Sequence, residues 1–129
     1  MDSGWWVVKL STVHCPLPTI MIDILATRAN LTPNREALYD LTSKIRYSYS
    51  ELNQRANRAG NFLREKYGVQ KGDRVSILAH NSIAYVDLLF GLGKIGAVLA
   101  PLNWRLTSRE LTYIVNDCQP KVLIVGPEF

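Results

Sequence analysis

A glycine pattern is the first feature of the sequence that could do chemistry. Residues 91–96 read Gly-Leu-Gly-Lys-Ile-Gly, the GxGxxG spacing of loops that bind the pyrophosphate of dinucleotides. That chemistry needs the glycines after a strand and at the start of a helix, where backbone N–H groups point at the phosphates. Here the glycines end a predicted helix and lead into a strand, so helix carbonyls would face the ligand and repel it. We therefore predict that these glycines form a tight turn and allow close packing of the helix on the sheet.

The other reactive side chains do not form a catalytic or metal-binding set. His14 and Cys15 are adjacent, but His80 and Cys118 are isolated, without the spacing of metal ligands. The sequence has no Walker-type loop and no GxSxG nucleophile motif. The acidic residues at predicted turns and helix ends are scattered as well: Asp73, Asp87, Glu110 and Asp117. From these residues we predict no catalytic residue and no metal site.

The glycines lie inside a strand–helix–strand unit that runs from Lys71 to Leu106. Two apolar runs, at residues 75–79 and 96–100, are short enough to be buried strands. Between them, Asn81 and Ser82 can cap a helix, because their side-chain oxygens accept from free backbone N–H groups. The helical spacing is carried by Tyr85, Leu88, Leu89 and Leu92. This βαβ unit predicts two parallel strands side by side.

Upstream, the pattern predicts a short helix and a β-hairpin. The apolar residues of the helix recur at helical spacing: Ile22, Leu25, Ala26 and Ala29. Residues 37–39 and 45–49 then read as two strands joined by a turn at 42–44, with Tyr49 on the same face as Ile45 and Tyr47.

A longer helix follows the hairpin, and we expect Ser50 to cap it. Its buried stripe is Leu52, Ala56, Ala59 and Leu63, with Phe62 alongside. Its arginines lie off that stripe and are predicted to face solvent: Arg55, Arg58 and Arg64. Gly68 stands where a glycine ends a helix, with Val69 behind it.

After the βαβ unit, Pro101 lacks the N–H that a ladder needs and is predicted to end the second strand. Thr107 and Glu110 then form a capping box before a further helix, and residues 122–125 read as a third buried strand. The predicted fold class is therefore α/β, with an N-terminal hairpin and helices leading into a β-α-β-α-β parallel sheet.

Composition fits a globular domain. Hydrophobic residues make up 47% and charged residues 20%, and the net charge of +4 comes from basic residues that are spread along the chain. We therefore expect no nucleic-acid surface. The two cysteines form no disulfide framework and nothing indicates secretion, so we expect a cytoplasmic protein. Residues 1–19 are too mixed for a signal peptide or a membrane span. Within them, Trp5 to Val8 could form a strand or an apolar tail.

A set of short motifs occurs in a fixed order along the chain. It begins at Tyr47–Leu52 and Arg55–Asn57 and continues through Gly68–Val75. It then runs through Asn81-Ser82, Gly96–Val98, Pro101–Leu106, Glu110-Leu111, Tyr113 and Asp117. In this order and spacing, the set resembles the N-terminal part of the AMP-dependent synthetases and ligases, the adenylate-forming family that includes acyl-CoA synthetases. The resemblance covers roughly residues 21–125, so we expect a truncated family subdomain at 21–129 and a non-matching extension at 1–20.

The resemblance implies a two-step reaction that uses ATP, magnesium and coenzyme A (CoA). Family members activate a carboxylic acid, such as a fatty acid, with ATP to an acyl-adenylate and then transfer the acyl group to the thiol of CoA. The family's Ser/Thr/Gly-rich phosphate loop is absent from this sequence. We therefore expect this chain to be inactive and without a cofactor by itself, with acid, ATP and CoA as partners of a longer parent only.

Arg105 is the one site residue that the resemblance transfers. It matches a position where an arginine of some acid–CoA ligases contacts the phosphates of the CoA nucleotide, and a guanidinium offers phosphate a planar fork of donors. The alternative is that Arg105 pairs with a local carboxylate or fixes its loop. Asn103 and Trp104 are predicted to be structural, and Arg74 to order its turn with Asp73.

Two alternatives to a ligase fragment remain open: a stand-alone α/β binding or interaction module derived from such an enzyme, and one half of a split enzyme. If the chain is truncated, we expect at least one uncovered sheet edge and one uncovered apolar face, because the family's sheet continues into later sequence. Such surfaces associate, so we predict poor solubility or oligomers for the isolated chain.

Overall fold

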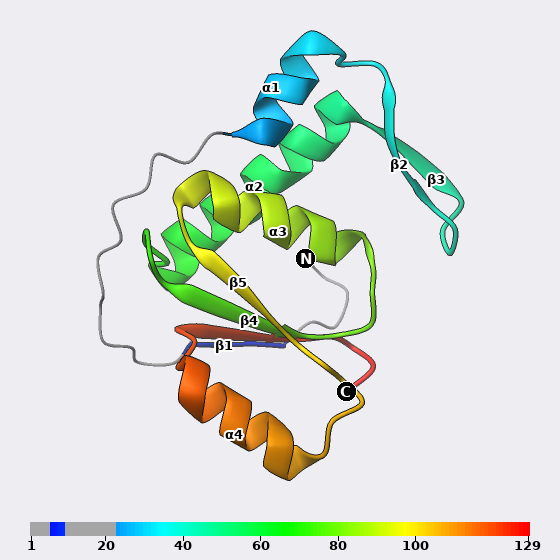
Figure 1. The fold of residues 1–129 in the computed structure, drawn as a ribbon. Coiled ribbons are helices and arrows are strands. Elements are labelled where there is room, and N and C mark those ends of the chain that lie inside the picture. The colour runs from blue at the N-terminus through cyan, green and yellow to red at the C-terminus, as the bar shows by residue number, and fades with distance from the viewer. Residues whose placement is uncertain (1–5, 10–22) are drawn as a thin grey trace.

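The structure, a computed structural model, describes residues 6–9 and 23–129, which form a four-stranded sheet, a separate two-stranded hairpin and four helices (Figure 1). The strands of the larger sheet are β1 (Trp6–Lys9), β6 (Val122–Val125), β4 (Arg74–Leu78) and β5 (Val98–Leu102), in that spatial order. The central strand β4 pairs in parallel with both β5 and β6. The predicted α/β class and the parallel βαβ unit are confirmed.

Of the two outer strands, β1 agrees with one of the two alternatives left open by the sequence, and β5 differs from the sequence expectation. Strand β1 pairs antiparallel with β6, so the apolar segment at Val7 and Val8 is a strand that occupies one edge of β6. Trp5 lies outside the described residues, as do His14, Cys15 and Ile22. Pro101 does not end β5 but lies within it, opposite Ile77. Among the described strands β5 pairs only with β4, and an outer strand tolerates a residue that cannot donate.

Helices cover both faces of this sheet (Figure 1). Helices α2 (Tyr49–Tyr67) and α3 (Ile83–Ile95) lie on one face and α4 (Ser108–Cys118) on the other. The core forms between the sheet and the α2–α3 pair. Its buried residues are Leu63, Val69, Val75, Ile77, Ala79, Leu88, Leu92, Ala97, Val122 and Ile124. The predicted stripe of α2 is buried, whereas no residue of α4 is fully buried.

Glycines let α2 and α3 cross with their backbones in contact. A Cβ added at Gly60 would lie 2.6 Å from the carbonyl oxygen of Gly91, and one at Gly91 would lie 2.7 Å from the carbonyl oxygen of Ala56. The GxGxxG segment therefore serves two structural purposes. Gly91 allows helix–helix packing, not the helix–sheet packing that we predicted, and Gly96 ends α3 with a φ of 74° in the expected turn.

The N-terminal elements are α1 (Ile24–Leu31), β2 (Glu36–Asp40) and β3 (Ile45–Ser48), and the hairpin projects away from the sheet (Figure 1). Tyr49 begins α2 and is not the last residue of the strand, because Ser48, not Ser50, is the N-cap. Ser48 and Glu51 form a full capping box. At the start of α3, Ser82 is the N-cap residue, but its side chain makes no capping bond.

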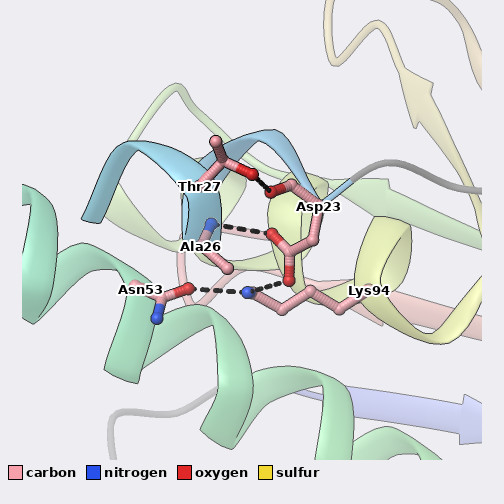
Figure 2. A network of polar contacts seen from close by, with 5 residues as sticks. All are labelled: Asp23, Ala26, Thr27, Asn53 and Lys94. Atoms are coloured by element: carbon pink, nitrogen blue, oxygen red, sulfur yellow. Dashed lines mark hydrogen bonds and ion pairs between the residues drawn. The ribbon is translucent and has the colours of Figure 1, made fainter. Parts of the chain in front are cut away.

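Helix α1 is held to the helix pair by a lysine (Figure 2). The Lys94 ammonium lies 2.5 Å from the Asp23 carboxylate, which precedes α1, and 2.6 Å from the side-chain oxygen of Asn53 on α2. Only 11% of the Lys94 side chain is exposed, against 38% for Asp23. Burial by itself would raise the pKa of Asp23, but the bonds from Lys94 and the Ala26 N–H more than offset it, so the pKa is lowered.

Arg55 corrects the expectation that the arginines of α2 face solvent. Its guanidinium makes two hydrogen bonds, of 3.0 and 2.7 Å, to the buried Asp87 carboxylate of α3, and it also lies over the Tyr47 ring. The hydrogen bonds that Arg55 donates to Asp87 raise the pKa of Arg55 against the opposing effect of burial. Arg58 and Arg64 are exposed as predicted.

Candidate functional site

The three parallel strands end at one edge of the sheet. Because open α/β sheets bind ligands at the carboxyl ends of their strands, this edge is the candidate site. The segments that follow β4, β5 and β6 place five side chains there. They are His80 after β4, Trp104 and Arg105 after β5, and Glu128 and Phe129 after β6. We call this group the carboxyl-edge cluster.

His80 is at the centre of the cluster. Its ring lies edge-to-face against Trp104, with centroids 4.5 Å apart and planes at 71°, and against Phe129, at 5.5 Å and 76°. Edge-to-face pairs place the positive rim of one ring over the negative face of another. The imidazole thus joins the segments that follow β5 and β6.

Glu128 adds a polar connection to the same residue. Its carboxylate accepts the backbone N–H of His80 and lies 3.9 Å from the imidazole Nδ1. The His80 N–H bond is the main reason that the pKa of Glu128 is lowered, since hydrogen bonds to a carboxylate favour its charged form. Burial and the Glu128 charge raise the pKa of the neighbouring Tyr85.

Arg105 is exposed at this edge. Its guanidinium carbon lies 4.9 Å from the centroid of the Trp104 ring. Within residues 6–9 and 23–129, no carboxylate forms an ion pair with Arg105. The loop is fixed by Asn103, whose side chain accepts the Arg105 backbone N–H at 3.0 Å and whose carbonyl accepts from Leu106. Among the described residues, the Arg105 guanidinium is therefore not paired with a carboxylate.

The other charged candidates lie in structural contacts away from this edge. We predicted that Arg74 orders its turn with Asp73. In the structure Lys121 forms an ion pair with Asp73 at 2.7 Å, and the Arg74 guanidinium donates to the carbonyl of Cys118. Glu110 caps α4, as predicted. In the part of the chain that the structure describes, no three His, Cys, Asp or Glu side chains are grouped to hold a metal ion.

Sequence reasoning identified Arg105 here but missed most of the cluster. It considered His80 only as a metal ligand and rejected it because it is isolated. It predicted Trp104 to be structural and gave Glu128 and Phe129 no role. The available signal was positional, because each of these residues follows closely on a predicted strand. Asn103 is structural, as predicted.

No helix among the described residues has the length and apolar character needed to cross a bilayer.

These features define an α/β domain with a prospective ligand-binding edge at the carboxyl ends of its parallel strands. The model of the AMP-binding enzyme family matches residues 25–128. The chain belongs to this family and corresponds to the N-terminal part of its acyl-CoA synthetases.

Two curated relatives illustrate the match. Long-chain-fatty-acid–CoA ligase FadD13 of Mycobacterium tuberculosis is 37% identical over 103 residues, which cover 80% of this chain and 20% of the ligase. Crotonobetaine/carnitine–CoA ligase of Escherichia coli is 42% identical over 84 residues, which cover 65% of this chain and 16% of the ligase. The chain thus spans between about one sixth and one fifth of the length of these curated relatives.

Solved structures agree. The inhibitor-bound N-terminal domain of FACL13 from Mycobacterium tuberculosis aligns with a TM-score of 0.73 at 36% identity, over 77% of this chain and 25% of that domain. The o-succinylbenzoate CoA synthetase MenE from Bacillus subtilis, in complex with its acyl-adenylate, aligns with a TM-score of 0.70 at 28% identity, over 74% of this chain and 24% of that protein.

Proposed function

We propose that this chain is the N-terminal part of an acid–CoA ligase that activates a carboxylic acid with ATP and magnesium and transfers the acyl group to CoA. The observation that carries the proposal is the match of residues 25–128 to the AMP-binding enzymes, together with relatives that are CoA ligases. The family subdomain spans 21–129, residues 1–20 are an extension, and the parent enzyme acts in the cytoplasm, where ATP and CoA are available.

In this proposal the chain contributes part of the enzyme's scaffold and no catalytic residue. Its sequence contains no Ser/Thr/Gly-rich phosphate loop, and the carboxylates of Asp73, Asp87 and Glu110 are each engaged in a structural contact. We therefore propose that the isolated chain does not adenylate an acid, and that it binds no cofactor by itself.

Arg105 is our candidate for contact with the phosphates of the CoA nucleotide. Its exposure, its place at the carboxyl edge and the absence of a carboxylate partner within the described residues support this assignment. A net hydrogen bond to a charged group contributes about 1.5–3 kcal/mol, and solvent exposure reduces this to about 1 kcal/mol. That free energy corresponds to roughly a fivefold change in affinity.

A chimera tests this function. Residues 25–128 replace the matching segment of FadD13, and two reactions are measured: pyrophosphate release on adenylation, which needs no CoA, and acyl-CoA formation. We expect the chimera to perform both. Replacing Arg105 with Ala should raise the KM for CoA about fivefold and leave adenylation unchanged. Arg109→Ala, which removes another exposed arginine of the same region, is the matched control and should change neither.

A chimera that folds but forms no acyl-adenylate would contradict the proposed scaffold. An unchanged KM for CoA in Arg105→Ala would contradict the assignment of Arg105 alone.

A further inference from the structure

We propose that His80 is a positioning residue for the Trp104–Arg105 loop, and that it sets where the Arg105 guanidinium is presented at the carboxyl edge. The consequence for CoA binding rests on the function proposed above. The placement of the guanidinium does not, and it can be tested on this chain directly.

The first step of the argument is that the position of His80 is itself fixed. Its backbone follows the central strand β4, beyond the buried Ala79, and its N–H is bound by Glu128. The backbone that carries the imidazole is thus anchored at the end of an inner strand, although 55% of the side chain is exposed. An exposed ring that contacts two aromatic rings from two other segments has the geometry of a spacer between them.

The second step concerns Trp104, which is 42% exposed on a loop and belongs to neither of the two hydrophobic clusters that the described residues form. The Asn103 bonds order the backbone of this loop, but they do not set the direction of the indole. Among the described residues, the Trp104 ring has one aromatic and one cationic contact: the His80 ring lies edge-to-face against it, and the Arg105 guanidinium lies over it. Without His80, the indole would be free to change rotamer.

The third step connects the indole to Arg105. The guanidinium lies over the Trp104 ring and forms no ion pair with a carboxylate among the described residues, so we infer that the ring supports it. A long side chain that is held in place loses less conformational freedom when a ligand binds. The chain of contacts therefore runs from β4 through His80 and Trp104 to the positive charge.

The test uses the 129-residue chain with Trp5 and Trp6 replaced by Phe, which leaves Trp104 as the only tryptophan of the three. Fluorescence quenching of Trp104 is measured with iodide, an anion, and with acrylamide, which is neutral, at constant ionic strength. A guanidinium about 5 Å from the indole attracts iodide and should raise its quenching roughly twofold relative to acrylamide. Arg105→Ala should remove this preference.

We expect His80→Ala to remove the iodide preference as Arg105→Ala does, and to lower the fluorescence anisotropy of Trp104. His80→Phe keeps an edge-to-face ring and should retain both signals. Asn81→Ala, an exposed neighbour, is the control and should also retain them. The double variant His80→Ala/Arg105→Ala should show no smaller preference than Arg105→Ala, because the two residues act through one contact.

The proposal is overturned if His80→Ala keeps the iodide preference and the anisotropy of the parent. Circular dichroism checks that each variant folds. If His80→Ala does not fold, His80→Leu, which keeps the bulk and removes the aromatic ring, takes its place with the same expected losses. An unchanged KM for CoA in the Arg105→Ala chimera would refute the ligase role of this arginine and leave the quenching result standing.

Discussion

Replacing Gly60 with alanine should separate α2 from α3. The added Cβ would lie 2.6 Å from the Gly91 carbonyl oxygen and 3.2 Å from its carbonyl carbon, so the obstacle is backbone and not a side chain that can rotate. To reach ordinary contact, the helices must move apart by several tenths of an ångström along their whole shared surface. That surface includes the buried Leu63 and Leu88 and the Arg55–Asp87 pair.

Two opposing contributions set the size of the effect. Overpacking of a rigid interior costs about 3 kcal/mol at the upper end of its usual range. Alanine in a helix is more favourable than glycine by about 1 kcal/mol, which offsets part of this cost. The net loss of unfolding free energy is about 2 kcal/mol, which lowers the Tm of a chain of this size by roughly 7 °C.

Urea and thermal unfolding followed by circular dichroism measure this loss. Asn57→Ala, on the exposed side of the same helix, is the matched control: it gains helix propensity without a clash and should leave stability within about 0.5 kcal/mol. Gly91→Ala should cost a similar amount to Gly60→Ala, and the double variant less than their sum, because one separation relieves both clashes. A Gly60→Ala chain as stable as the parent would refute the close helix crossing.

Four further predictions follow from other contacts. Lys94→Met should cost about 1 kcal/mol in urea unfolding, below the value for a fully buried pair because Asp23 is 38% exposed; no loss would contradict the role of this ion pair. Because the pKa of Asp23 is lowered in the folded state, its contribution to stability should be present above about pH 4 and be lost as pH falls through the folded pKa. When the pH is lowered through this range, the urea midpoint should therefore drop less in Asp23→Asn than in the parent. Thr107→Ala, which removes the α4 capping box, should cost about 1 kcal/mol on thermal unfolding, and an unchanged Tm would speak against it. The isolated chain should self-associate through its exposed β5 edge, where Val98 is 45% exposed, and a single monomer boundary in sedimentation velocity at high concentration would argue against this.

The spacing of apolar residues predicted most of the fold from the sequence. The α2 stripe, the strand at 122–125 and the Thr107–Glu110 capping box are local patterns, and each lies where we predicted it. The strands predicted at 75–79 and 96–100 are present, but they begin and end one or two residues away, at 74–78 and 98–102. Local patterns were ambiguous where two signals competed within a residue or two. Ser48 and Ser50 can both cap a helix, and the pairing of Ser48 with Glu51 decides between them.

Contacts between distant segments were not readable in the same way. Arg55 lies off the apolar stripe of its own helix, and only the crossing of α2 over α3 brings Asp87 to it. The sequence alone indicates that Gly91 belongs to a turn motif, because nothing in it shows that Gly60 faces Gly91. The carboxyl-edge cluster joins three strand ends, so His80, Trp104 and Phe129 share no spacing in the sequence, and only the parallel sheet order brings them together.

Our central proposal is that this chain is part of the scaffold of an acid–CoA ligase and does not adenylate an acid by itself. One pyrophosphate-release assay tests it most directly. The isolated chain and the FadD13 chimera carrying residues 25–128 are each given ATP, magnesium and a fatty acid. We predict release by the chimera and none above background by the chain. Sustained release by the 129-residue chain, or none by a folded chimera, would contradict the account.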